Sequence, residues 1–66
     1  MRIILNKDAQ IIPDSMSIND LLEHLNIKIK YIAIEVNETI VPKSEYDTFN
    51  LKENDNVEII NAVGGG

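Results

Sequence analysis

Residues 17–25 of this chain, SINDLLEHL, decide its fold class. Their apolar members recur at i, i+3, i+4 and i+7, the spacing of one stripe along an α-helix: Ile18, Leu21, Leu22 and Leu25. Ser17 is a good N-cap, Asp20 stands in the place of the capping-box glutamate, and Asn26 predicts the end of the helix. The stretch therefore predicts one short amphipathic helix, which can cover one face of a sheet.

Short β-prone runs surround this helix. Residues 2–6 and 9–13 flank the polar turn 6–8 and predict a hairpin whose turn type stays open, because the turn lacks glycine. Residues 31–36 and 39–41 predict two more strands joined by a turn at 37–38, and residues 57–63 predict the last strand. One helix with four or five strands in this order predicts an α+β fold.

Length and composition exclude several classes of protein. The 66 residues make one small domain, and the absence of cysteine excludes disulfides, zinc thiolate sites and thiol nucleophiles. A net charge of −5 argues against nucleic acid, whose phosphates need a basic face. No segment approaches the roughly 20 apolar residues that span a membrane, and residues 1–6 are too short for a signal peptide. A cytoplasmic location is therefore expected.

The residues that could carry catalysis do not form a recognisable constellation. His24 is the only histidine and falls on the flank of the predicted helix, away from its apolar stripe. Ser15, Ser17 and Ser44 have no evident activating base. Residues 53–56 have the polar character of a calcium loop but lack its central glycine and terminal glutamate. We therefore expect no metal site and no catalysis by this chain itself.

Strand alternation separates two sets of apolar side chains. One set is assigned to the face beneath the helix: Ile3, Leu5, Ile34, Val36 and Ile59. The other is assigned to the uncovered face: Ile4, Ala33, Ile60 and Ala62. Because an exposed apolar patch on a small protein often marks a docking site, these four residues are expected to bind a partner. The alternative is that they are ordinary scattered surface aliphatics.

The sequence ends on Gly64-Gly65-Gly66, directly after the last predicted strand. Glycine has no Cβ, so three in a row predict a thin, flexible tail over residues 64–66, attached to a domain over residues 1–63. Such a tail can thread a narrow channel and present the Gly66 carboxylate to another protein's active site. The alternatives are an inert terminus and an expression scar. An unactivated carboxylate is a poor electrophile, so a partner must activate it first.

Several segments of the chain resemble the ThiS branch of the ubiquitin-like ThiS/MoaD family. They are residues 3–6 (IILN), 18–22 (INDLL), 32–37 (IAIEVN), 40–43 (IVPK) and 57–66 (VEIINAVGGG). The resemblance covers essentially the whole chain, with residues 41–43 and the glycines as its most specific parts. It implies a β-grasp fold, in which one helix covers a mixed sheet of four to five strands and a flexible glycine tail follows. Glu38 and Asn54 stand where the family commonly has glycine.

The same resemblance implies a sulfur carrier of thiamine biosynthesis rather than an enzyme. A ThiF-like partner would use ATP and magnesium to adenylate Gly66, and a persulfide sulfur donor would convert it to a thiocarboxylate. A ThiG-like thiazole synthase would accept the sulfur, with Gly64 and Gly65 providing the slim approach to both partners. This chain would bind no cofactor itself, and it would act in the cytoplasm or, if organelle-encoded, in the stroma.

Three other functions stay open from the sequence. The small subunit of molybdopterin synthase has a similar fold and tail and also carries sulfur as a thiocarboxylate. A ubiquitin-like modifier would instead be joined through Gly66 to lysines of target proteins. A plain interaction domain would have an inert tail. Replacement of Gly66 would abolish the sulfur-carrier and modifier activities and leave the interaction domain unaffected.

Overall fold

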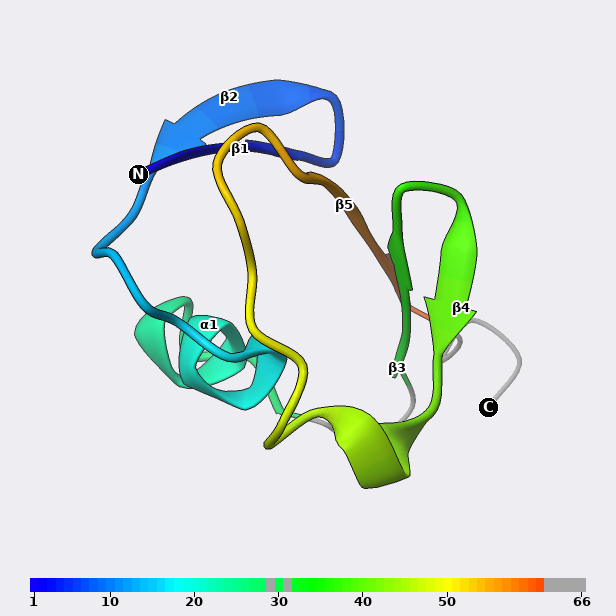
Figure 1. The fold of residues 1–66 in the computed structure, drawn as a ribbon. Helices are drawn as coiled ribbons and strands as arrows, with labels where there is room; N and C mark the ends of the chain where they lie inside the picture. Colours follow the sequence, from blue (N-terminus) through cyan, green and yellow to red (C-terminus); the bar gives the residue numbers. More distant parts are fainter. Residues whose placement is uncertain (29, 31, 62–66) are drawn as a thin grey trace.

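The computed structural model describes residues 1–28, 30 and 32–61. Within this part of the chain, five strands and one α-helix are arranged as Figure 1 shows, with a short 3₁₀ turn between the last two strands. The elements are β1 (Arg2–Leu5), β2 (Asp8–Ile11), α1 (Ile18–His24), β3 (Ile32–Val36), β4 (Thr39–Val41), η1 (Lys43–Glu45) and β5 (Asn56–Asn61). The predicted α+β class is confirmed, and the sheet has five strands.

The sheet has the strand order β2-β1-β5-β3-β4, so the last strand in sequence lies at its centre. β5 pairs parallel to β1 and antiparallel to β3, while both hairpins are antiparallel, which makes the sheet mixed. A parallel neighbour cannot be reached by a tight turn, and the long connection between β1 and β5 contains α1 and the second hairpin. This topology places β5 between the two hairpins.

Helix α1 begins and ends as its sequence predicts. The Asp20 backbone N–H donates to Ser17 Oγ at 3.0 Å, and the Ser17 N–H donates to Asp20 Oδ2 at 3.1 Å, which completes a capping box. At the other end, Asn26 has a positive φ of 59°. The Asn26 and Ile27 N–H groups donate to the carbonyls of Glu23 and Leu22, which is a Schellman ending.

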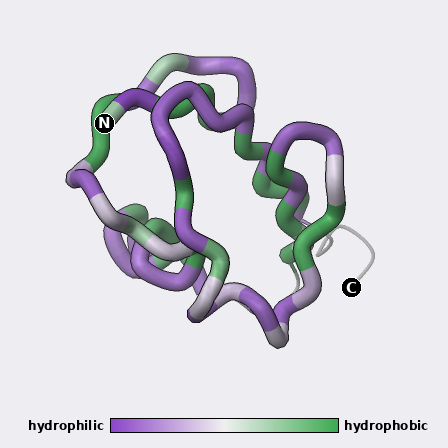
Figure 2. Tube along the Cα trace, in the orientation of Figure 1, coloured by the Kyte–Doolittle hydropathy of each residue, from purple (hydrophilic) through white to green (hydrophobic). Residues whose placement is uncertain are grey.

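The core lies between α1 and one face of the sheet. The predicted apolar stripe is buried at Ile18, Leu21 and Leu22, and Leu25 packs against the core from its rim. From the sheet, Ile3, Ile34 and Val36 are buried as alternation predicts, and Leu5 and Ile59 pack against them. In Figure 2 the last part of the loop that leads into β5 is hydrophilic, while Leu51, earlier in the same loop, is buried in the core.

The first hairpin has a tighter turn than residues 6–8 suggested. Strand β1 ends at Leu5 and β2 begins at Asp8, so Asn6 and Lys7 alone form the turn. Both have positive φ, 48° and 73°, as a type I′ turn requires. Asparagine tolerates this backbone conformation at position 6, whereas Lys7 adopts it at a position that favours glycine.

Candidate functional site

The site is built around β5, the strand that leads toward the glycines. Strand β5 pairs with β3 over five residue pairs, from Val36↔Val57 to Ile32↔Asn61. Val57 is completely buried, which anchors the strand to the core. The predicted site residues Ala62, Gly64, Gly65 and Gly66 lie outside the described residues. The structure therefore defines the anchored strand from which the tail continues.

Asn6 supports β5 where pairing with β1 ends. Its backbone N–H donates to the Val57 carbonyl at 2.9 Å. Its side-chain Oδ1 accepts a hydrogen bond from the Ile59 N–H at 2.8 Å. The Asn6 side chain thus accepts the hydrogen bond that a further residue of β1 would have accepted from β5. The Asn6 backbone cannot do so, because it already belongs to the β1–β2 turn. This keeps β5 hydrogen-bonded on its β1 side as far as Ile59.

A network centred on Asp55 holds the start of β5. Asp55 is buried, and its two carboxylate oxygens accept hydrogen bonds from Asn37 Nδ2 at 3.0 Å and from the Lys52 N–H at 2.8 Å. Asn37 Oδ1 in turn accepts from the Asn56 N–H at 2.9 Å. The network joins the β3–β4 turn to the loop before β5, because Asn37 belongs to that turn. It fixes the position at which β5 enters the sheet.

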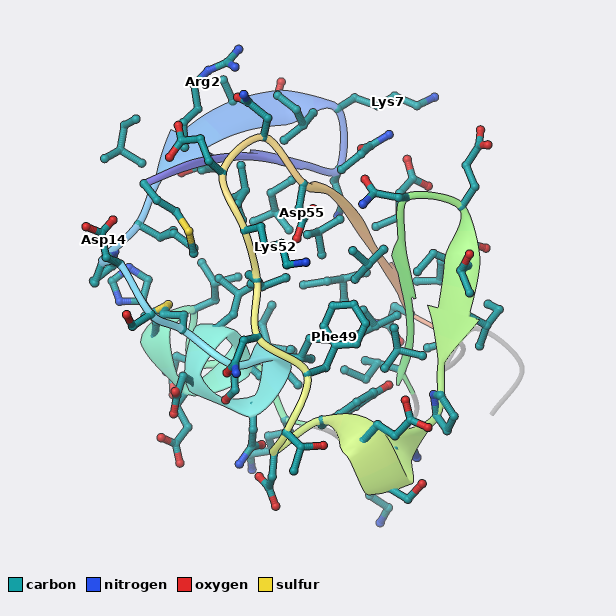
Figure 3. The ribbon with its side chains drawn as sticks, in the orientation of Figure 1. Arg2, Lys7, Asp14, Phe49, Lys52 and Asp55 are labelled. Atoms are coloured by element: carbon teal, nitrogen blue, oxygen red, sulfur yellow. The ribbon has the colours of Figure 1, made fainter. Side chains whose placement is uncertain are left out.

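An open hollow of about 410 Å³ lies beside this network. Its lining comprises Asn37, Thr48, Phe49, Asn50, Lys52 and Asp55. Figure 3 shows Phe49, Lys52 and Asp55 around the same opening, whereas Lys7 projects from the hairpin turn at the edge of the molecule. Sequence reasoning did not find this hollow, because it forms only where the loop of residues 48–55 approaches the β3–β4 turn.

Glu38 and Asn54, the two residues that stand where the family commonly has glycine, both have a left-handed backbone conformation. Asn54 has a φ of 69°, which asparagine tolerates as expected. Glu38 has a φ of 70° and follows Asn37 with a φ of 52°, so the β3–β4 turn is also of type I′. Glu38 therefore occupies a left-handed position that favours glycine, as expected where the family commonly has that residue.

The sheet face opposite α1 carries three of the four predicted docking residues. Ile60 is 42% exposed, and Ala33 lies directly opposite it on β3. Ile4 lies on the same face but pairs in register with Asn56. Ile60 is four residue steps along β5 from Asn56, which is roughly 13 Å of strand. Ile60 and Ala33 therefore form one patch and Ile4 stands apart, and their role in docking stays a prediction.

Three further residues share this face and were not among the predicted docking residues. Ile40 of β4 is 57% exposed, and the alternation of Thr39-Ile40-Val41 contained the signal that would have found it. Glu35 lies opposite both Ile40 and Glu58 on the two neighbouring strands. The pairing of the two glutamates depends on the strand register, which the sequence alone does not state.

The following ionisable groups lie outside the strands. The N-terminal ammonium lies 2.8 Å from Asp14 Oδ1 and, by hydrogen bonding and charge, holds the pKa of that carboxyl below its usual value. Burial raises the pKa of the Tyr46 hydroxyl. His24 is exposed in the last turn of α1.

Within residues 1–28, 30 and 32–61, no three His, Asp or Glu side chains are grouped closely enough to hold a metal ion. No helix of this described part is both long and apolar enough to cross a membrane.

Comparison with known proteins places these features in a family. The model of the ThiS family matches residues 2–66. The sulfur carrier protein ThiS of Bacillus subtilis is 35% identical over 60 residues, which cover 91% of each chain. The thiazole synthase of Paramagnetospirillum magneticum is 33% identical over 66 residues, and the match spans all of this chain but only 20% of that protein. The crystal structure of ThiS from Geobacter metallireducens superposes with a TM-score of 0.88 at 25% identity and covers 100% of both chains.

Proposed function

This chain belongs to the ThiS family, and we propose that it carries sulfur as a thiocarboxylate on Gly66 and donates it to the thiazole of thiamine. The observation that carries the proposal is the extent of the family match, which runs from residue 2 through the three glycines. The likeness to a sulfur carrier protein over 91% of both chains and the shared fold support it.

In this proposal the chain is a carrier on which partner enzymes act. A ThiF-like enzyme uses ATP and magnesium to join the Gly66 carboxylate to AMP, with release of pyrophosphate. The resulting anhydride has AMP as a good leaving group, so the terminal sulfur of a donor persulfide can displace it. A thiol then cleaves the S–S bond of the acyl persulfide and leaves the thiocarboxylate on Gly66. The ATP and magnesium belong to the partner's site.

The chain's own residues contribute position and access. Val57, Asn6 and the Asp55 network anchor β5, so the domain presents the residues that follow Asn61 from a defined point. Gly64 and Gly65 lack a Cβ and allow the backbone to enter a narrow site beside Gly66. Each tail residue ordered in a partner costs about 1–2 kcal/mol of conformational entropy, so contacts of the folded domain must offset that cost.

A ThiG-like thiazole synthase is the proposed acceptor of the sulfur. The likeness of the whole chain to about a fifth of a thiazole synthase supports this partnership, because it suggests that the carrier unit and the acceptor enzyme act together. The proposed place of action is the cytoplasm, or the stroma of an organelle that encodes the chain.

The test is the intact mass of the chain after incubation with a ThiF-type enzyme, ATP, magnesium and a sulfur donor. We expect replacement of one oxygen by one sulfur, localised to Gly66 by fragmentation. The matched control is the chain extended by one residue past Gly66, in which Gly66 has no free carboxylate and should gain no sulfur. An unchanged mass, with an enzyme proven active on its own carrier, would contradict the proposal. Isopeptide products on lysines would identify a protein modifier, and transfer to a pterin precursor would identify the molybdopterin pathway.

A further inference from the structure

Asn6 and Asn37 occupy equivalent places on the two sides of β5. Asn6 is the first residue of the β1–β2 turn, and Asn37 is the first residue of the β3–β4 turn. Both have a left-handed φ, 48° and 52°, and both turns are of type I′. Because β1 and β3 are the neighbours of β5 in the sheet, one turn lies on each side of it. We call Asn6 and Asn37 the asparagine clamps.

On the β1 side, Asn6 forms both hydrogen bonds that a residue of a parallel strand would form. Its backbone N–H donates to the Val57 carbonyl at 2.9 Å, and its side-chain Oδ1 accepts from the Ile59 N–H at 2.8 Å. In a parallel ladder the backbone carbonyl accepts the second of these bonds. The side-chain oxygen of Asn6 replaces that carbonyl, because the Asn6 backbone belongs to the turn.

On the β3 side, Asn37 forms the two hydrogen bonds of an antiparallel pair. Its N–H donates to the Asn56 carbonyl at 2.8 Å, and its Oδ1 accepts from the Asn56 N–H at 2.9 Å. Two paired antiparallel residues normally exchange both bonds through their backbones. Here too the side-chain oxygen replaces the backbone carbonyl. Asn37 Nδ2 also donates to Asp55 Oδ1 at 3.0 Å, which fixes the orientation of the amide group.

The Asn6 side chain supports β5 beyond the point where ladder pairing with β1 stops. Pairing with β1 ends at Leu5↔Val57, whereas pairing with β3 continues as far as Asn61. The Ile59 N–H is directed toward the β1 side and is accepted there by Asn6. Asn6 therefore extends the two-sided support of β5 from Val57 to Ile59.

Side-chain alternation alone would not prevent β5 from shifting along its own axis. A shift by two residues keeps every side chain on its face of the sheet and moves the strand by about 7 Å. Such a shift would break the hydrogen bonds of both asparagine clamps. The three glycines at the end of the chain span at most about 10 Å. A shift of β5 would therefore change the reach of the tail by a large part of its length.

We propose that the asparagine clamps are positioning residues for the reaction at Gly66. They hold β5 at one register, so that the tail leaves the domain at one fixed point. The inference rests on the proposed function, because the reaction is the adenylation of Gly66. Without a clamp, the end of β5 must be ordered each time the adenylating enzyme binds, and this cost is present in the bound ground state and in the transition state alike. Such a cost raises KM and leaves kcat unchanged.

The test is Asn6→Gly, because glycine accepts the left-handed φ of the turn and the substitution removes only the side chain. The rate of ATP–pyrophosphate exchange by a ThiF-type enzyme is measured against the concentration of the full chain, well below the melting temperature of each variant. We expect KM for the chain to rise about fivefold and kcat to stay within about twofold of wild type. Hydrogen exchange of the Ile59 amide, followed by NMR, should become about tenfold faster, since its acceptor is lost.

Asn6→Asp is the rescue variant, because a carboxylate oxygen accepts the same N–H and aspartate tolerates the same backbone conformation. Its KM and its Ile59 exchange should lie near those of wild type. Lys7→Gly is the matched control, since it introduces glycine at the second position of the same turn, with a φ of 73°, and removes no acceptor from β5. It should change neither quantity at physiological ionic strength, where the loss of one exposed charge contributes little.

Asn37→Gly tests the β3 side, with Glu38→Gly as its matched control in the same turn. Asn37→Gly should raise KM at least as much as Asn6→Gly, and it should also lower the melting temperature, because Asp55 loses its Nδ2 donor. Glu38→Gly should raise the melting temperature, since glycine suits the φ of 70° at that position. Equal KM values for these two variants would overturn the inference for Asn37.

An unchanged KM for Asn6→Gly would overturn the inference for Asn6, whatever the exchange of Ile59 shows. A KM for Asn6→Asp as high as that for Asn6→Gly would also overturn it, because the acceptor would not be the cause. Both results differ from a failure of the proposed function, in which the wild-type chain supports no pyrophosphate exchange by an enzyme proven active on its own carrier. In that case the proposed function is wrong and the inference falls with it.

Discussion

Asp55 shows how one residue can hold together parts of the chain that are far apart in sequence. It is only 9% exposed, and each of its carboxylate oxygens accepts a hydrogen bond from a different loop. Hydrogen bonds to a charged group are stronger than those between neutral groups, which suits a junction that must position β5. The sequence suggested only a polar turn at this place, since nothing local indicates that Asn37 lies beside it.

Asp14 gives the protein a pH-dependent contribution to stability. The N-terminal ammonium bonds to it and lowers the pKa of its carboxyl below the usual 3.8. A lowered pKa in the folded state means that the contribution is complete above the unfolded value and is lost as pH falls through the folded value. We expect the melting temperature to fall below pH 4, with a small amplitude because the Asp14 side chain is 82% exposed.

The variant Asp14→Asn should remove this part of the pH dependence and leave the melting temperature near pH 7 slightly lower. The measurement is thermal unfolding by circular dichroism between about pH 2 and 7, in low and in high salt. Asp47→Asn provides the control, because the Asp47 carboxyl is exposed and forms no ion pair with a cation among residues 1–28, 30 and 32–61. Identical pH profiles for wild type and Asp14→Asn would show that the ammonium contact contributes nothing.

At the scale of single elements, α1 depends on its ends. It has seven residues, and helices this short are not stable alone in water, so capping and burial of its apolar stripe hold it. Ser17 and Asp20 satisfy each other's backbone N–H groups, and Asn26 permits the left-handed residue that ends the helix. The local sequence and the tertiary packing therefore both favour a helix at residues 18–24.

Replacement of Ser17 by alanine should lower the free energy of unfolding by about 1 kcal/mol, because the Asp20 N–H loses its acceptor at the helix start. The measurement is urea unfolding followed by circular dichroism. Ser44→Ala in η1 is the matched control, since Ser44 is exposed and η1 has no side-chain cap. An equal effect of the two substitutions would show that the capping box does not stabilise the helix.

At the scale of the whole molecule, the two faces of the sheet differ in burial: α1 covers one of them, and large apolar side chains are exposed on the other. Ile34 is completely buried beneath α1, whereas Ile60 is 42% exposed on the opposite face. Ile34 pairs with Ile59, the residue before Ile60, so successive positions of the same strand pair point to opposite faces. A small domain with one core can use its second sheet face for binding without loss of that core.

Two aspartate substitutions should separate these faces. Ile60→Asp is expected to leave the domain folded, with a melting temperature within a few degrees of wild type, and to weaken binding of the adenylating enzyme. Ile34→Asp buries a charge in the core and should unfold the domain. Thermal unfolding and enzyme titration of both variants check this. Unfolding of Ile60→Asp would place Ile60 in the core and remove it from the docking surface.

The sequence by itself determined the elements that local patterns encode. The 3.6-residue period of residues 18–25, the capping residues and the strand alternation predicted the helix, the class of fold and the division of residues between the two sheet faces. These predictions succeeded because each depends on residues near one another in the chain, where propensity and burial act together. The resemblance to the ThiS family, which the comparisons confirm, is what suggested a function for the glycine tail.

Only the tertiary structure decided what depends on register and on contacts between distant segments. It placed β5 at the centre of the sheet, set Glu35 against Glu58, separated Ile4 from Ile60 and brought Asn37 to Asp55. Strand partners and register are set by the packing of the whole core, because a strand's own alternation fits several neighbours equally well. The arrangement of charge on the sheet face opposite α1 is therefore a property of the folded molecule.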